Sequence, residues 1–225
     1  MARSVSPKEE LKDSGAGGDF IAESQPKGKR FFALIKFILG ILLLPFVYGV
    51  SLGFLNEFSQ VGALVQKSFW RGVCFFVVLH LFIWELTPIF AKGQKLLEFL
   101  FVFFKPLLKI GPQLVPIFTL FSFLFYGVAS LLVPEIKMYF IFAAGATIAL
   151  HLTCSAKSLR SRQKDFLRAN YLFGFSFIYI FNLILLGLCL NFISANFSFV
   201  DFINLSFAKS QAIFYTVFKQ LFVVS

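Results

Sequence analysis

Six polar side chains that could take part in proton transfer, hydrogen bonding or metal binding lie inside or close to long apolar stretches of the sequence. They are His80, Glu85, Thr147, His151, Cys154 and Asn182. Polar groups are costly to bury in hydrocarbon without a partner, so they often mark functional sites in membrane proteins. An imidazole and a carboxylate can act as acid and base, and an imidazole with a thiolate can bind a metal. These six residues, named here the polar cluster, are the candidate intramembrane site.

The same residues also fit a purely structural role. Thr147, His151 and Ser155 recur every four residues and share one helix face. Similar polar stripes run through 119–130 and 176–189. Stripes on several helices indicate faces that turn toward each other, where side chains hydrogen-bond between helices. Because isolated Ser, Thr and His residues commonly serve packing in this way, the structural role is the preferred interpretation.

A pair between Glu85 and His151 is the sharpest form of the site hypothesis. Each lies about 8 to 9 Å from the cytoplasmic end of its predicted helix, at roughly 1.5 Å per residue. A charged pair at one depth would relieve the cost of burying either group. His151 and Cys154 supply only two of the three or four ligands that zinc needs, so no metal or other cofactor is predicted.

The composition requires a membrane environment. Of the 225 residues, 58% are hydrophobic, only 14% are charged and 35 are Phe, and the mean hydropathy is +0.82. A soluble domain of this size could not bury so much apolar surface. The sequence therefore predicts an all-α, polytopic helical membrane protein with the lipid bilayer as its first partner. A nucleic-acid partner is excluded despite the formal charge of +10, because Lys and Arg cluster at the ends of apolar runs.

About five stretches are long enough to cross a hydrocarbon core, which takes about 20 apolar residues. They cover 32–55, 69–91, 113–133, 137–156 and 170–193. Pro45 and three glycines in the first stretch predict a kink or a tight helix contact there. The glycines are Gly40, Gly49 and Gly53.

The remaining segments complete the predicted organisation. Residues 96–108 are too short to cross and should be re-entrant or lie on the cytoplasmic surface. The chain thus divides into a disordered cytoplasmic tail (1–30), a transmembrane helical bundle (31–195) and an amphipathic C-terminal segment (196–225).

The C-terminal segment is predicted to contain an amphipathic helix at the outer interface. In 210–224, apolar residues recur at helical spacing opposite Gln211 and Lys219. A sixth span over 197–222 is the disfavoured alternative, because Asp201 and other polar residues interrupt it.

The positive charges predict the orientation. Lys and Arg precede the first predicted span and separate the second from the third and the fourth from the fifth, most densely in SAKSLRSRQK. The opposite loops, 56–68 and 134–136, carry few charges. Five spans place the three basic regions on one side, so the positive-inside rule predicts a cytoplasmic N-terminus and a C-terminus on the other side. The basic segment is therefore interpreted as a topology anchor and not as a ligand site.

Catalytic signatures are missing from the sequence. It contains no G-x-S-x-G, glycine-rich phosphate loop, C-x-x-C or H-E-x-x-H motif. Cys74, Cys154 and Cys189 all lie within apolar segments, where they fit small core residues better than a disulfide framework. These patterns do not favour an enzyme.

Four segments together resemble small bacterial membrane proteins grouped with the site-2-protease-like metallopeptidases. They are FWRGVCFFVVLHLFIWELTPIFAKGQKLLEFL, PQLVPIFTLFSFLFYG, FAAGATIALHLTCSAKSLRSRQKDF and IYIFNLILLGL, within 69–193. The resemblance implies a location in the bacterial inner membrane. In that family an H-E-x-x-H helix follows the second span, whereas this chain has AKGQKLLEFLF there. The resemblance therefore implies a relative without the zinc-binding apparatus, and no active-site residue carries over.

Three classes of function follow. The preferred one is a non-catalytic scaffold or pseudoprotease-like subunit that binds another membrane protein or a second copy of itself. The alternatives are a small permease or channel subunit that uses the polar stripes, and a membrane metallopeptidase with an unrecognised site. A transporter would more readily show internal repeats, and the sequence shows none.

Overall fold

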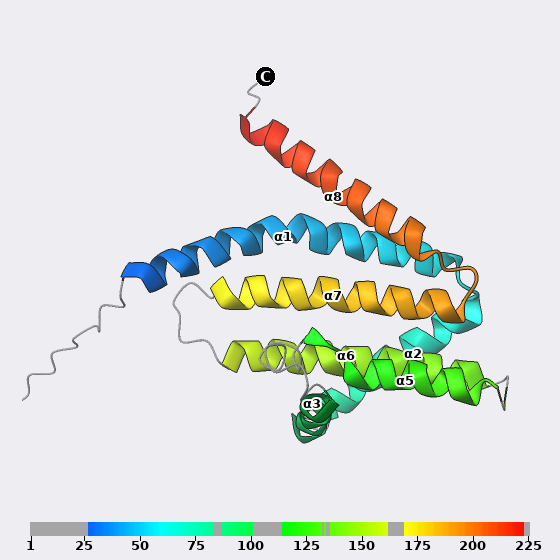
Figure 1. Cartoon of the computed structure of the whole chain (residues 1–225). Helices are drawn as coiled ribbons and strands as arrows, with labels where there is room; N and C mark the ends of the chain where they lie inside the picture. The colour runs from blue at the N-terminus through cyan, green and yellow to red at the C-terminus, as the bar shows by residue number, and fades with distance from the viewer. Residues whose placement is uncertain are drawn as a thin grey trace, which may run out of the picture.

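The computed structural model describes residues 27–82, 87–100, 114–131, 133, 136–161 and 169–222. Its helices are α1 (Lys27–Gln60), α2 (Ala63–Phe82), α3 (Thr87–Leu100), α5 (Ile117–Ala129), α6 (Lys137–Ser161), α7 (Ala169–Ile193) and α8 (Phe199–Phe222) (Figure 1). These described residues contain no strand. The prediction of an all-α fold is confirmed.

Four helices are long and apolar enough to cross a membrane. Their spanning parts are Leu34–Gln60, Ala63–Phe82, Lys137–Arg160 and Tyr171–Ile193. By length and composition the chain is thus a multi-pass helical membrane protein. The second predicted span, 69–91, runs too far, because Thr87 begins α3. Pro88 suits the first turn of a new helix, where its missing N–H needs no partner.

The third predicted span, 113–133, contains the shorter helix α5. This helix has 13 residues, which is about 20 Å, whereas the hydrocarbon core is about 30 Å thick. The buried Pro116 precedes its first residue and Ser130 follows its last. The described residues therefore contain four helices that are long enough to span and one shorter apolar helix, and a fifth span at 113–133 stays a prediction.

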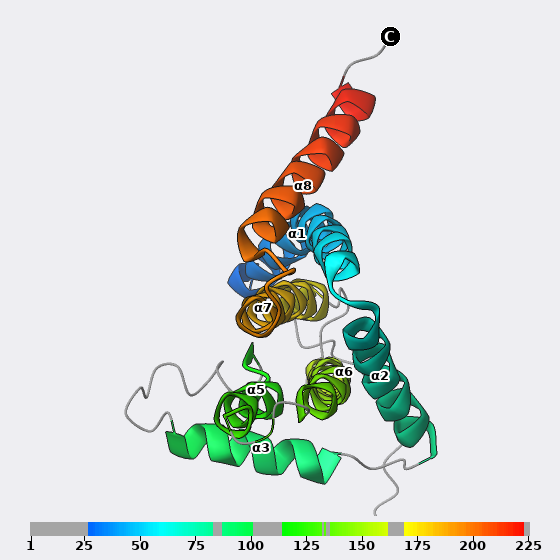
Figure 2. The ribbon, with the colours of Figure 1, turned by 90° about the vertical axis from the view of Figure 1, so that its right-hand side faces the viewer.

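The helices form two packed groups. The most extensive contacts join α1 to α7 and α8 in one group and α2 to α6 in the other, with α5 also packed on α6. In Figure 1, α1, α5, α6 and α7 run side by side, and Figure 2 shows them nearly end-on. Below them in Figure 2 lies α3, almost perpendicular, while α8 leaves the bundle at an angle. Contacts between α6 and α7 join the two groups.

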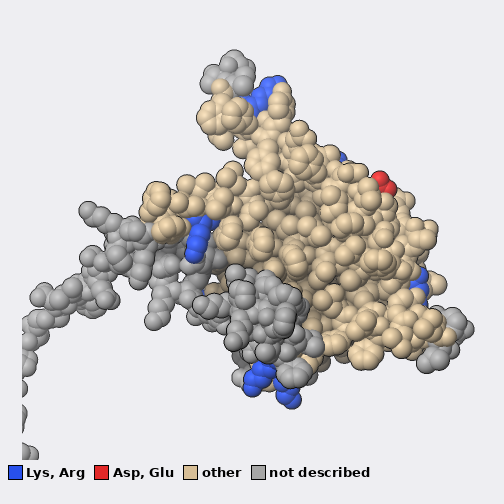
Figure 3. Space-filling view, in the orientation of Figure 1, with Lys and Arg blue, Asp and Glu red and all other residues tan. Residues whose placement is uncertain are grey.

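The helix ends fall at two opposite ends of the bundle. In Figure 1, α1 and α7 begin and α6 ends on the left, whereas α1 and α7 end and α6 begins on the right. The basic end of α6, with Lys157 and Arg160, therefore lies at the same end as the start of α1. On the face drawn in Figure 3, Lys and Arg lie around the edge and the area between them is almost entirely uncharged. This uncharged area is the surface expected to face lipid.

Parts of two predicted segments lie outside the described residues. In the predicted tail, 1–26 lies outside them, while 27–30 already belong to α1. Lys and Arg are good helix formers, so the helix continues into the basic residues that precede the apolar run. In the predicted surface segment, 96–100 are the end of α3 and 101–108 lie outside the described residues.

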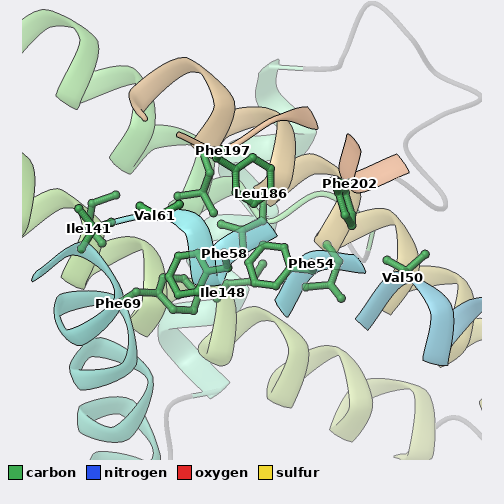
Figure 4. Close-up of a cluster of buried hydrophobic side chains, with 13 residues drawn as sticks. Val50, Phe54, Phe58, Val61, Phe69, Ile141, Ile148, Leu186, Phe197 and Phe202 are labelled. Atoms are coloured by element: carbon green, nitrogen blue, oxygen red, sulfur yellow. The ribbon is translucent and has the colours of Figure 1, made fainter. Parts of the chain in front are cut away.

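The main core is a cluster of Phe, Ile, Leu and Val side chains where α1, α2, α6 and α7 meet the chain that enters α8 (Figure 4). Phe54 makes three ring contacts within it. Its ring stacks on Phe58 at 5.5 Å and meets Phe197 at 6.0 Å and Phe202 at 6.2 Å. Aromatic pairs of this kind contribute about 0.5 to 1.5 kcal/mol each beyond the area they bury. These ring contacts pack the start of α8 against α1.

Glycines allow α2 and α6 to touch along their backbones. A Cβ added at Gly72 would lie 2.0 Å from the Phe142 carbonyl oxygen, and one at Gly145 would lie 2.2 Å from that of Phe69. Near the helix starts, the Ser68 hydroxyl donates to Met138 Sδ at 3.7 Å. Small residues at such crossings permit close van der Waals packing, which is a main attraction between helices in lipid.

A second close crossing joins α1 to α8. The prediction of a tight contact at the α1 glycines is confirmed, because Gly49 and Gly53 face two buried serines, Ser210 and Ser206. Added Cβ atoms would lie 2.1 Å from Ser210 Oγ and 2.2 Å from Ser206 Oγ, respectively. Each serine hydroxyl donates to the carbonyl four residues earlier in α8, at 2.7 Å. The serine side chains thus lie against α1 with their hydrogen bonds satisfied.

The two halves of α8 differ in their surroundings. Phe202, Ser206 and Ser210 are buried, whereas every residue from Tyr215 to Phe222 is exposed. The predicted apolar stripe is helical, and Phe214 contacts Phe46 of α1 with ring centres 5.4 Å apart. The buried face of α8, however, contains the small residues Ser206 and Ser210, which the apolar pattern does not predict. The position of α8 at the outer interface stays a prediction.

The orientation can be measured with an impermeant thiol reagent on intact cells. In a background without native cysteines, we expect the reagent to label Asn196→Cys, because this exposed residue lies between α7 and α8, at the predicted outer end. The Ser161→Cys variant, at the end of α6, should react only after the cells are permeabilised. Labelling of Ser161→Cys in intact cells would contradict the predicted orientation.

Candidate functional site

His151 of the polar cluster lies between α6 and α3. Its side chain is 4% exposed, and its ring meets that of Phe90 in α3 with centres 5.7 Å apart and planes at 53°. One turn along α6, Cys154 packs with Phe76, Phe90 and Leu150 in a second apolar cluster. The imidazole and the thiol therefore border the contact that holds α3 against the bundle.

Thr147 lies at the contact between α6 and α5. Its hydroxyl donates to the Ala143 carbonyl at 2.8 Å, so the 3.1 Å contact with Thr119 Oγ1 uses the Thr119 proton. One turn further along α5, the Ser122 hydroxyl donates to the Phe140 carbonyl at 3.2 Å. The polar stripes on α5 and α6 therefore face each other and hydrogen-bond, as the structural interpretation requires.

Asn182 anchors the chain before α5 to α7. The side chain is fully buried, and its amide nitrogen donates to the Leu114 carbonyl at 3.0 Å and to the Ile178 carbonyl at 2.7 Å. Its amide oxygen is buried and has no hydrogen-bond partner among the described residues. The bond to Leu114 fixes the backbone just ahead of Pro116, where α5 begins.

His80 lies at the end of α2, beside a cavity. Its ring stacks on Phe76 with centres 5.7 Å apart and planes at 13°. Together with Thr153, Lys157 and Arg160 of α6 and Tyr171 of α7, it lines a cavity of about 440 Å³. From the sequence, this part of α6 is predicted only to be a topology anchor. His80 lies in the middle of the predicted span 69–91, so no signal in the sequence placed it beside the basic end of α6.

The contacts distribute the polar cluster over separate interfaces. Thr147 contacts α5, His151 contacts α3, Asn182 contacts the chain before α5, and His80 borders the cavity between α2, α6 and α7. Glu85 lies outside the described residues, so its pairing with His151 stays a prediction.

The cysteines are free, and only Cys154 is buried, whereas Cys74 is exposed and Cys189 is half-buried. Cys74 is thus not the core residue expected from the sequence.

The helix α3 contains the segment AKGQKLLEFL, where the predicted family resemblance, which stays a prediction, expects a zinc-binding helix. Its buried Gly93 contacts the Phe118 ring of α5, since a Cβ added there would lie 2.5 Å from a ring carbon. Lys92 and Lys95 on the same helix are exposed. Across the described ranges, no three His, Cys, Asp or Glu side chains lie close enough to hold a metal ion. Here α3 serves as a packing helix beneath α5 and α6.

The sequence matches no family model, and comparisons with curated proteins and with solved structures give no match either.

Proposed function

We propose that the protein is a non-catalytic membrane scaffold, or pseudoprotease-like subunit, that binds another membrane protein through the outer half of α8. The observation that carries this proposal is the set of large apolar side chains that this half presents away from the bundle. They are Tyr215, Val217, Phe218, Leu221 and Phe222, between 46% and 70% exposed. An apolar helix face of this kind typically docks into a groove or against another helix.

The packing of the inner half of α8 supports this proposal. Because α8 is held to α1 at Ser206 and Ser210, its outer half is directed away from the bundle (Figure 2). A helix held at one end loses less conformational freedom when a partner binds the other end. The arrangement suits presentation of a surface better than packing within the chain.

The use of the polar side chains favours a scaffold over a permease. Hydrogen bonds between helices involve Thr119, Thr147, Ser122 and Asn182. Tyr179 likewise donates to Ser51, whose own proton goes to the Val47 carbonyl. Side chains that hold helices together in this way stabilise one arrangement. The permease or channel subunit and the unrecognised metallopeptidase remain the alternative proposals.

The proposed partner can be captured with a photo-reactive residue. We expect a benzoyl-phenylalanine at Phe218 to give one discrete protein adduct in native membranes. The matched control is the same residue at Leu124, which is 64% exposed on α5 and is not part of the proposed surface. The adduct should survive purification in mild detergent and be identified by mass spectrometry.

Two outcomes would contradict the proposed function. Lipid adducts alone at both positions would show that α8 contacts only the bilayer. Purified protein that contains near-stoichiometric zinc and cleaves a membrane substrate would overturn the non-catalytic assignment and favour the metallopeptidase.

A further inference from the structure

We infer that the cavity between the ends of α2, α6 and α7 is a binding site for a phosphate group, and that the headgroup of an anionic membrane phospholipid supplies it. The cavity of about 440 Å³ is lined by His80 and Leu81 of α2, Thr153, Lys157 and Arg160 of α6, and Tyr171 of α7. None of the described residues that line it is acidic. It is therefore a positively charged pocket with added hydroxyl and imidazole groups, which are the usual ligands of a phosphate.

The position of the cavity along the helices matches the level of lipid headgroups. The apolar part of α6 ends at Arg160, that of α7 begins at Tyr171, and α2 ends at Phe82. All three helices thus contribute residues from the same end of their spans. Basic pockets between transmembrane helices at this level attract the phosphates of anionic lipids, which lie just outside the hydrocarbon.

Packing holds the imidazole at the cavity, whereas the two basic side chains, Lys157 and Arg160, are exposed. The His80 ring is stacked on Phe76, and Thr153 precedes the buried Cys154 and Ser155 on α6. Lys157 and Arg160 are three residues apart and therefore share one helix face. Tyr171 lies in the first turn of α7 and places its hydroxyl group at the same end of the bundle.

An apolar surface next to the cavity favours a lipid over a free anion. Leu81 lines the cavity and is 72% exposed, and the adjacent Phe82 is 83% exposed. An acyl chain can lie along these side chains while its headgroup phosphate occupies the basic part of the cavity. This site is separate from the surface on α8 and does not depend on the proposed protein partner.

The test measures lipid binding to the full-length protein in nanodiscs of phosphatidylcholine. Fluorescent phosphatidylglycerol is titrated into the wild type, into Lys157→Gln/Arg160→Gln, and into the control Lys92→Gln/Lys95→Gln. The control removes the same charge from exposed residues of α3. We expect the cavity variant to bind roughly tenfold more weakly than the control, because it loses charge-assisted contacts in addition to surface attraction.

A second variant tests whether binding requires the hydroxyl groups of the cavity or only its positive charge. Thr153→Val/Tyr171→Phe keeps every charge and should still weaken binding several-fold, because it removes two hydroxyl donors. Equal thermal stability of all variants without added lipid checks that they fold. The same titration with inorganic phosphate identifies the source: saturable binding to these residues would still support a phosphate site but assign it to a free anion. Equal affinity of the cavity variants and the α3 control for the lipid would overturn the proposal.

Discussion

Replacing Gly72 with alanine is expected to destabilise the bundle by about 3 kcal/mol, in the upper part of the range for overpacked cores. The added Cβ would lie 2.0 Å from the Phe142 carbonyl oxygen and 3.0 Å from the Ala146 nitrogen. Both are backbone atoms, so no side-chain rotation relieves the overlap. The helices α2 and α6 must move apart by about 1 Å or more, which also loosens the core around Phe69. Unfolding in mixed detergent micelles measures the change in free energy.

The control is the same substitution at Gly127 in α5, where a Cβ would meet nothing within 4 Å. Alanine forms helices better than glycine, so Gly127→Ala should be neutral or stabilise by up to about 1 kcal/mol. A difference between the two variants of less than about 0.5 kcal/mol, the usual additivity error, would show that α2 and α6 do not touch at Gly72.

The reciprocal contact at Gly145 sharpens this expectation. A Cβ there would lie 2.2 Å from the Phe69 carbonyl oxygen, on the partner helix and one turn before Gly72. Once one substitution has moved the helices apart, the second should meet less resistance. The double variant Gly72→Ala/Gly145→Ala should therefore destabilise by less than the sum of the single changes.

The helices could be predicted closely where composition changes sharply. The predicted span 170–193 and the observed Tyr171–Ile193 differ by one residue, because polar residues bound this apolar run on both sides. The start of α3 could not be predicted in this way, since the apolar character of 69–91 continues past the end of α2. Hydropathy measures the tendency to enter lipid and contains no information about where a chain turns.

The candidate site could likewise be predicted only where a sequence pattern reports a contact directly. The facing stripes of α5 and α6 could be predicted from their four-residue spacing, and the bond between Thr119 and Thr147 confirms them. The contact of His151 with Phe90 could not be predicted, because the hydropathy pattern divides α3 between a predicted span and a predicted surface segment. Serines count as polar, so a search for apolar stripes does not identify Ser206 and Ser210 as a packing surface.

The contact between α1 and α8 predicts a specific rescue. Gly53→Ala should separate the helices, because its Cβ would lie 2.2 Å from Ser206 Oγ. Adding Ser206→Ala removes that oxygen, and the nearest remaining atoms are then the Phe202 carbonyl oxygen at 3.0 Å and the Ser206 nitrogen at 3.1 Å. The pair should therefore restore most of the contact. Cross-linking of Phe46→Cys to Phe214→Cys with a short bifunctional maleimide reports whether α8 is docked, because the native rings lie 5.4 Å apart.

Gly49 provides the contrasting case. Its Cβ would lie 2.1 Å from Ser210 Oγ but also 2.6 Å from the Ser206 carbonyl oxygen. Ser210→Ala removes only the first of these, so Gly49→Ala/Ser210→Ala should stay undocked. Equal rescue at both glycines would show that the two helices are not in backbone contact. If α8 presents a binding surface, partner capture at Phe218 should fall in the variants that lose docking of α8 to α1. Capture should return only in the double variant Gly53→Ala/Ser206→Ala. Capture that persists in undocked variants would instead mean that α8 binds its partner without support from α1.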